Sequence, residues 1–303
     1  GKNKIEAVNF VSGHLVINSL QDAHSKIDVY TTAGKRVREI KLPGLGTATR
    51  MSGNPDDSFA YYAYADFFTP NTVYKVNIAT GHSQVWKRPK TAVDSSKYTA
   101  KQVFFTSKDG TKVPMFVVHK KGLKMDGTNP TLLYGYGGFN SSQLPWFSTS
   151  RSVWMDMGGV WCLANIRGGG EYGEAWWQAA IKTKRQKAYD DFIAAGEWLV
   201  KNKVTQPKML AIQGGSNGGL LVGEQPVGDG PRGACARASV RAEHAGVGHV
   251  GGLERSFASC RLGRFQRRFH VRFDDGRGRS RARGGTEALD GRAGGHGPDR
   301  PRD

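Results

Sequence analysis

The sequence predicts an α/β domain over residues 99–223, an all-β segment over residues 1–98 and an arginine- and glycine-rich tail over residues 224–303. Three observations support this division: alternating apolar runs and turns in the first segment, buried strands alternating with a helical pattern in the second, and loss of lysine in the third. No apolar run reaches the roughly 18 residues that a membrane-spanning helix needs. Three cysteines are too few for a disulfide framework or a four-ligand zinc site.

Residues 1–98 contain strand signals without helical periodicity. Short apolar runs are bounded by turn clusters such as Asn54–Asp57 and Thr80-Gly81. The runs that predict strands include residues 7–11, 14–17, 27–30 and 72–76. Short strands at this spacing are typical of a sandwich, a barrel or propeller blades, and periodicity alone does not choose among the three.

Residues 99–223 alternate strands with helix. A hairpin across Asp109-Gly110 is predicted to join residues 102–105 and 113–118. Apolar runs dense enough for strands buried on both faces follow at residues 131–134, 160–164 and 209–212. A helix is predicted over residues 187–202, where Ala188, Phe192, Ala195 and Leu199 recur at helical steps. This alternation favours an α/β unit with a parallel sheet.

The last buried strand runs directly into Gly214-Gly-Ser216-Asn-Gly218, and apolar helix-forming residues follow. Gly-x-Ser-x-Gly in this context is the nucleophile-elbow pattern of α/β-hydrolases. A serine raised on a tight strand-to-helix turn leaves no room for neighbouring side chains, and helix amides there can hold a developing oxyanion. The alternatives are a chance glycine-rich loop and a phosphate cradle. We therefore predict that Ser216 is a nucleophile.

Two further clusters follow other predicted strands. Tyr134-Gly-Tyr-Gly-Gly-Phe139 occupies a position from which α/β-hydrolases draw an oxyanion donor, and the Tyr136 hydroxyl could supply it. The alternative is a glycine-rich turn with packing tyrosines. In Asn165-Ile-Arg-Gly-Gly-Gly-Glu-Tyr-Gly173, we expect Arg167 and Glu171 to form a structural ion pair. The acidic pair at residues 190–191 is expected to head the following helix, where it would serve structure or the helix dipole.

These three motifs, in this order, closely resemble the prolyl oligopeptidase (prolyl endopeptidase) family of serine peptidases, and Thr106–Phe116 fits the same family. The resemblance covers residues 1–223. It implies an α/β-hydrolase domain capped by a seven-bladed β-propeller. Residues 1–98 would then be the final blades of a partial propeller, and residues 99–223 the N-terminal half of the catalytic domain. On this basis the chain looks truncated.

The resemblance also implies roles for individual residues. Ser216 matches the nucleophile, the Asn217 backbone N–H and the Tyr136 hydroxyl match the oxyanion donors, and Phe139 matches an apolar residue near the proline-binding pocket. The implied reaction cleaves short peptides after proline through an acyl-enzyme, without a metal or other cofactor. The implied partners are short proline-containing peptides, not a membrane or nucleic acid, and the chain is expected to be a monomer. A cytoplasmic location is favoured, with the periplasm as the alternative.

The catalytic aspartate and histidine are not identifiable in this chain. In the family both lie C-terminal to the serine, where this chain offers Asp274, Asp275, Asp290, Asp299, His244, His249, His270 and His296. None of these sits in a sequence that resembles the family's. The earlier histidines, His14, His24, His82 and His119, precede the nucleophile and are expected to be ordinary surface or strand residues.

The tail differs chemically from the rest of the chain. Residues 224–303 contain 16 arginines but no lysine, isoleucine, asparagine, methionine, tyrosine or tryptophan. The missing types mostly have AT-rich codons, so we predict that the tail is an out-of-frame translation of a GC-rich gene. Because it has few large apolar residues, it is expected to be disordered.

Two other functions remain open on the sequence. The net charge of +18 fits a basic nucleic-acid-binding protein, and loss of the triad partners fits a catalytically dead α/β-hydrolase-like module. We nevertheless favour a serine peptidase by ancestry. Because the base of the triad is missing, the chain as written is expected to have little or no peptidase activity. Because missing blades and sheet strands leave hydrogen-bonding edges open, it is also expected to fold poorly.

Overall fold

The computed structural model describes residues 3–223 and the backbone of residues 235–238, all of which belong to one compact unit of the chain. We predict from the sequence that residues 224–303 are an out-of-frame translation and disordered. These residues lie outside the described part of the chain, apart from the strand at 235–238. That strand falls in the segment for which disorder was expected.

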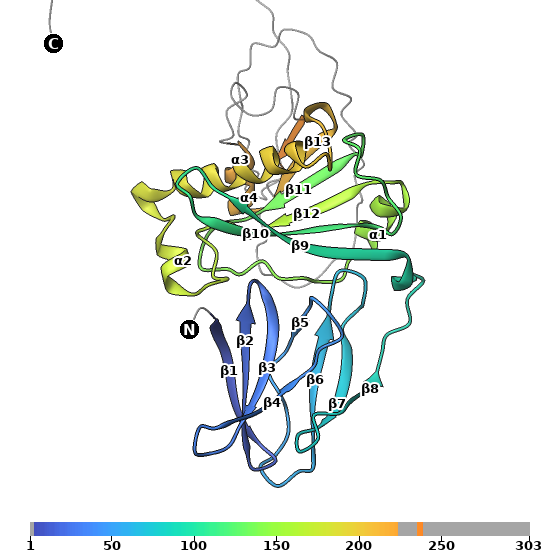
Figure 1. Cartoon of the computed structure of the whole chain (residues 1–303), viewed down its shortest axis with the longest axis vertical. Helices are drawn as coiled ribbons and strands as arrows, with labels where there is room; N and C mark the ends of the chain where they lie inside the picture. The colour runs from blue at the N-terminus through green and yellow to red at the C-terminus, as the bar shows by residue number, and fades with distance from the viewer. Residues whose placement is uncertain (1–2, 224–234, 239–303) are drawn as a thin grey trace, which may run out of the picture. The chain divides into compact units, whose positions relative to one another are not determined.

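Residues 4–87 form two antiparallel four-stranded sheets, each with its strands in chain order (Figure 1). The first comprises β1 (Lys4–Val11), β2 (His14–Gln21), β3 (His24–Tyr30) and β4 (Arg36–Ile40). The second comprises β5 (Thr47–Ala48), β6 (Phe59–Ala65), β7 (Thr72–Asn77) and β8 (Ser83–Lys87). One apolar core joins them, with Val29 and Ile40 from the first sheet and Tyr62 and Val76 from the second. Packed four-stranded meanders are typical of propeller blades, one of the three architectures that periodicity left open.

A mixed six-stranded sheet follows, in the order β14-β13-β11-β12-β10-β9. Its strands are β9 (Tyr98–Thr106), β10 (Lys112–Lys120), β11 (Thr131–Gly135), β12 (Val160–Ala164), β13 (Leu210–Gly214) and β14 (Cys235–Ala238). The strands β11 to β14 run parallel to one another, whereas β9 and β10 form the predicted antiparallel hairpin at one edge. The α/β class is therefore confirmed, with a sheet that is mixed because the hairpin extends its parallel part.

The two faces of this sheet contribute to different cores, which explains why its strand β12 is apolar at every position. Val160, Cys162 and Ala164 of β12 pack into one core, and Trp161 and Leu163 pack into the other. Successive side chains of a strand point to opposite faces, so a strand covered on both sides needs an unbroken apolar run. The second core also includes residues that precede the sheet in the chain, Ala23 and Phe67.

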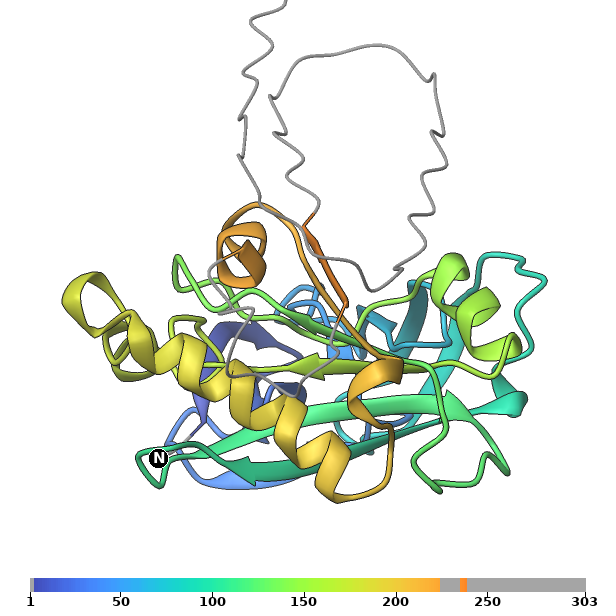
Figure 2. The ribbon, with the colours of Figure 1, turned by 90° about the horizontal axis from the view of Figure 1, so that it is seen from above.

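The helices are α1 (Thr149–Asp156), α2 (Glu174–Gln178), α3 (Gln186–Lys201) and α4 (Asn217–Gly223), with 3₁₀ turns at Ser95–Lys97, Lys182–Lys184 and Pro207–Met209. Figure 2 shows α3 lying across one face of the sheet. The predicted apolar stripe of α3 enters the core there, and Ala188, Ala195 and Leu199 are fully buried. No helix in residues 3–223 is long and apolar enough to cross a membrane.

Two expectations about charged residues are wrong. The acidic pair at residues 190–191 does not head α3, which begins at Gln186. Instead, Asp191 is fully buried and accepts hydrogen bonds from Arg167, with Arg167 Nη2 and Asp191 Oδ1 2.6 Å apart. Arg167 consequently pairs with Asp191 and Asp109, not with Glu171. Both errors arose because these ion pairs join segments that are distant in the sequence.

Candidate active site

Ser216 lies between the end of β13 and the start of α4, on the sharp turn that the motif predicts. Its backbone has φ of +51°, in the left-handed region that costs a residue with a Cβ on the order of 1–3 kcal/mol. Its side chain is exposed, and its hydroxyl has no hydrogen-bond partner among the described residues. The serine is therefore held in a strained conformation with its hydroxyl accessible.

The motif glycines are required by close backbone approach within the elbow, residues 214–218. A Cβ on Gly214 would overlap the backbone carbonyl of Gly218. A Cβ on Gly218 would lie 2.5 Å from the carbonyl oxygen of Gly135, at the end of the neighbouring strand β11. Because both obstacles are backbone atoms, neither can rotate aside. The elbow can form only without a side chain at Gly214, and it can pack against β11 only without one at Gly218.

The backbone N–H of Asn217 is available for a ligand. The adjoining amides are occupied, since Gly218 N–H donates to Gly215 O at 2.7 Å and Gly219 N–H donates to Ser216 O at 2.9 Å. Asn217 is the first residue of α4, and its N–H has no acceptor among the described residues. An unpaired N–H immediately after an exposed serine is the arrangement that an oxyanion hole requires.

The tyrosine loop, residues 136–143, lies against the elbow. Its first residue, Tyr136, follows β11, which pairs with β13 in parallel register, so both loops leave the same end of the sheet. Asn217 Nδ2 donates to Tyr136 O at 2.5 Å, and a Cβ on Gly138 would overlap the Asn217 side chain. Tyr136 is half-buried, and its hydroxyl has no described hydrogen-bond partner. The structure therefore brings Tyr136, Ser216 and Asn217 to one end of the sheet.

Phe139 projects from the tyrosine loop, and 77 % of its surface is exposed. It has φ of +54°, as does Asn140 after it, so the backbone at the loop tip is left-handed for two consecutive residues. A side chain this exposed buries little apolar surface and so contributes little to the stability of the fold. A free aromatic surface beside the elbow is available to an apolar ligand group.

Arg185 is the site residue that sequence reasoning missed. It immediately precedes α3, and its Nη1 donates to Gly137 O while its Nη2 donates to Asn217 Oδ1 at 3.2 Å. In the sequence it lies in the basic run Lys182–Lys187, which looks like a solvent-exposed charge cluster. Nothing local distinguishes it from its lysine neighbours, because both of its partners come from other loops.

Buried polar residues support the tyrosine loop from beneath. Glu171 is 1 % exposed, and its Oε1 accepts from the backbone N–H of Gln143 at 2.8 Å and from Asn165 Nδ2 at 3.4 Å. Burial raises the pKa of Glu171 to about 7. In the hairpin turn between β9 and β10, hydrogen bonds from Arg167 hold the pKa of the exposed Asp109 well below its usual value. The pKa shifts of both carboxyl groups are therefore explained by their burial and hydrogen bonds within the fold.

The histidines before the nucleophile lie on or next to strands, as expected. His14 and His24 lie in the first four-stranded sheet, His82 precedes β8 and His119 lies in β10. None of the four hydrogen-bonds to Ser216. The candidate triad residues after the serine, Asp274, Asp275, Asp290, Asp299, His244, His249, His270 and His296, lie outside the described residues. In the described part of the chain, no three His, Cys, Asp or Glu side chains are grouped to hold a metal ion.

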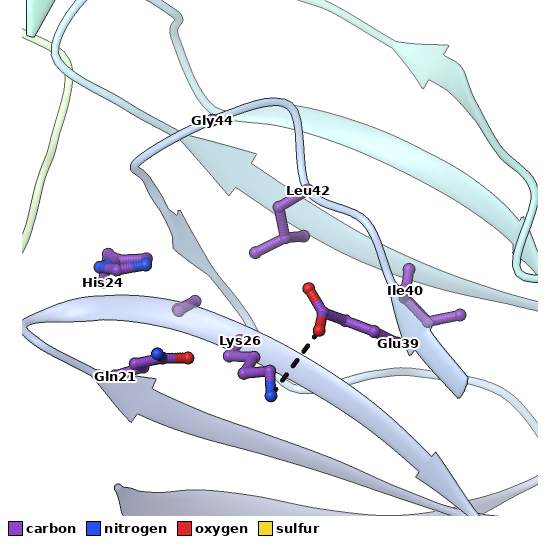
Figure 3. Close-up of a pocket in the computed structure, with 8 residues that line it drawn as sticks. Gln21, His24, Lys26, Glu39, Ile40, Leu42 and Gly44 are labelled. Atoms are coloured by element: carbon purple, nitrogen blue, oxygen red, sulfur yellow. Dashed lines mark ion pairs between the residues drawn. The ribbon is translucent and has the colours of Figure 1, made fainter. Parts of the chain in front are cut away.

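A separate hollow of about 350 Å³ lies in the first four-stranded sheet (Figure 3). Its lining includes His24, Lys26, Glu39 and Leu42, and Lys26 pairs with Glu39 at 3.7 Å. None of its lining residues belongs to the elbow or to the tyrosine loop. The hollow is therefore distinct from the candidate active site.

Comparison with known proteins places both parts of the chain in one family. Residues 145–226 match the model of the prolyl oligopeptidase family, and residues 1–89 match that of the prolyl oligopeptidase N-terminal beta-propeller domain. The prolyl endopeptidases of Elizabethkingia meningoseptica and Elizabethkingia miricola are 46 % and 48 % identical to this chain over 216 residues. Those residues are 71 % of this chain but 31 % of either relative, so the chain spans about a third of their length.

Solved structures show the same likeness. One, from a study of two prolyl endopeptidases and their inter-domain dynamics, is 50 % identical, with a TM-score of 0.70 over 75 % of this chain and 34 % of that one. Prolyl oligopeptidase B from Galerina marginata is 33 % identical, with a TM-score of 0.70 over 77 % of this chain and 33 % of that one. The resemblance seen in the three sequence motifs and the fold of a partial propeller before a partial α/β-hydrolase domain are both confirmed. This chain belongs to the prolyl oligopeptidase family of serine peptidases.

Proposed function

We propose that the chain carries the nucleophile half of a serine endopeptidase site that acts on short peptides at proline. The observation that carries this proposal is the elbow itself. An exposed serine is held at a positive φ between two glycines that allow no side chain, next to an unpaired amide. Strain of this kind persists only where surrounding structure enforces it, and it is concentrated at functional sites.

The reaction that fits this geometry is acyl transfer. Ser216 Oγ attacks the carbonyl carbon of the peptide bond after proline, the new C–O bond forms, and negative charge develops on the carbonyl oxygen. The Asn217 N–H and the Tyr136 hydroxyl donate to that oxygen. When the C–N bond breaks, the amine leaves with the proton that the serine hydroxyl has lost. Each donor of this kind contributes about 10²- to 10³-fold to the rate.

Phe139 is proposed to contact the proline ring. Its exposed face offers apolar surface, and a proline side chain carries three methylene groups but no polar atom. We also propose the division of the chain at residue 98, where the last blade strand has ended and the first strand of the six-stranded sheet begins.

The proton-accepting base is supplied by no described histidine. Losing the histidine of such a triad costs on the order of 10⁶ in kcat, whereas oxyanion donors and binding alone retain roughly 10³- to 10⁴-fold over the uncatalysed reaction. We therefore expect negligible peptide turnover by this chain, but residual reactivity focused on Ser216.

The test measures that residual reactivity on the purified 303-residue chain. An N-acylated glycyl-proline diphenyl phosphonate transfers phosphorus to a serine hydroxyl, with phenol leaving, and peptide mass spectrometry follows each serine over hours. Ser58 is the internal control, because it is exposed and has no described hydrogen-bond partner. We expect Ser216 to react about 10³ times faster than Ser58, and Ser216→Ala to abolish the fast phase.

Two results would count against the proposal in different ways. Equal rates at Ser216 and Ser58 would refute the nucleophile assignment. Complete labelling of Ser216 within minutes would leave that assignment intact and refute the expectation that the chain lacks a working base.

A further inference from the structure

We propose that Arg185 is a positioning residue that fixes the two oxyanion donors relative to each other. This inference rests on the proposed function, because it concerns the same site. Its basis is a closed ring of hydrogen bonds. Arg185 Nη1 donates to Gly137 O, Arg185 Nη2 donates to Asn217 Oδ1 at 3.2 Å, and Asn217 Nδ2 donates to Tyr136 O at 2.5 Å. Tyr136 and Gly137 are neighbours in the chain, so the ring closes through one peptide bond.

The ring matters because the donors belong to different segments. Tyr136 and Asn217 are 81 residues apart and leave separate strands of the sheet. An oxyanion hole works only when both donors reach the same oxygen at about 2.7–3.1 Å. A misplacement of about 1 Å can cost 10²-fold in rate. Two loops that leave different strands therefore need hydrogen bonds between them to keep their donors positioned to within about 1 Å.

Arg185 connects both loops to a helix whose apolar face is anchored in the core. It immediately precedes α3, and its guanidinium is 5.4 Å from the centroid of the Tyr189 ring. The buried side chains of α3, Phe192 and Leu199 among them, anchor the helix in the core of the sheet. The backbone that carries the guanidinium is therefore held in place, and the planar guanidinium can donate to two acceptors from two segments at once.

The charge of Arg185 has a second consequence. No described carboxylate lies within ion-pair distance of it, and its described partners are a backbone carbonyl and a side-chain amide. An uncompensated positive charge beside the donors favours a state in which negative charge develops nearby. Arg185 is consequently expected to support the oxyanion through its field as well as through its geometry.

The experiment compares Arg185→Met and Arg185→Lys with Lys184→Met in the full chain. Lys184 is the matched control, since it is the preceding residue, carries the same charge, is exposed and makes no described side-chain contact. Labelling of Ser216 by the glycyl-proline phosphonate is separated into the reagent dissociation constant and the first-order rate constant kinact. Melting temperatures are recorded for every variant.

We expect Arg185→Met to lower kinact by about 10- to 100-fold while changing the dissociation constant less than twofold. If Arg185 served stability alone, its replacement would lower the melting temperature without lowering kinact selectively relative to the dissociation constant. Arg185→Lys should fall between wild type and Arg185→Met, because an ammonium keeps the charge but loses the fork. Lys184→Met should match wild type in both constants.

The outcomes that overturn this inference differ from those that overturn the proposed function. If wild-type Ser216 outpaces Ser58 and Arg185→Met reacts as fast as wild type, the positioning role is wrong and the nucleophile stands. If wild-type Ser216 reacts no faster than Ser58, the proposed function fails and the positioning role fails with it. If Arg185→Met has a lower melting temperature than Lys184→Met, its loss of kinact could reflect lost stability. The comparison of Arg185→Lys with wild type then tests the inference, and an unchanged kinact in Arg185→Lys overturns it.

Discussion

Replacing Glu171 with glutamine should remove a pH-dependent loss of stability from this protein. The Glu171 carboxyl is 1 % exposed, and only one of its oxygens has a described hydrogen-bond partner. Burial disfavours the charged form, which raises the pKa of Glu171 to about 7 from an ordinary 4.5. Glutamine keeps the accepting oxygen for the backbone N–H of Gln143 and has no charge to bury.

The magnitude follows from that pKa difference. Below pH 4.5 the group is protonated in the folded and unfolded states, so its contribution to stability is complete. As the pH rises from 4.5 through 7, the unfolded chain ionises first and the folded state becomes relatively less stable. Each unit of pKa difference corresponds to about 1.4 kcal/mol, so the full loss is about 3 kcal/mol.

The assay is urea unfolding at pH 4.5 and pH 8, followed by tryptophan fluorescence, with Glu174→Gln as the exposed control. Between these two pH values, wild type and Glu174→Gln should each lose about 3 kcal/mol more than Glu171→Gln loses. If Glu171→Gln shows the same pH dependence as wild type, Glu171 is not the buried acid that this reasoning requires.

Two further predictions concern the supporting ion pair and the loop tip. Asp191→Asn should lower the free energy of unfolding by about 3–5 kcal/mol, because it leaves the buried Arg167 without its main partner. Asp190→Asn at the preceding position should lower the free energy of unfolding far less, and chemical denaturation of both variants measures the difference. Phe139→Ala should leave stability within about 0.5 kcal/mol, since the side chain is exposed. It should also weaken binding of the proline phosphonate by about 1 kcal/mol or more, and unchanged binding would remove Phe139 from the site.

Sequence reasoning succeeded where the signal was local. The placement of Ser216 on a strand-to-helix turn was predicted correctly, because a strand, a tight glycine turn and a helix follow one another within a few residues and each leaves a pattern. The buried strand β12 was found over all five of its residues, because a strand covered on both faces is apolar throughout. The stripe of α3 was found because helical periodicity is local as well.

It failed where a residue's role depends on a distant partner. Arg167 was assigned to Glu171 four positions away, but the fold brings it to Asp191 on α3. Arg185 was not distinguished from adjacent lysines, although its partners are 48 and 32 residues away. A charged side chain shows its sign in the sequence but not its partner. The tertiary fold supplies that information.

The most direct test of the account measures the contribution of the Tyr136 hydroxyl to the reactivity of Ser216. Tyr136→Phe deletes one oxygen from a residue that is half-buried and has no described hydrogen-bond partner at that hydroxyl, so the fold should persist. We predict that kinact for phosphonylation of Ser216 falls by about 10²-fold, while labelling of Ser58 is unchanged. A kinact equal to that of wild type would contradict the assignment of the tyrosine loop and the elbow to one oxyanion site.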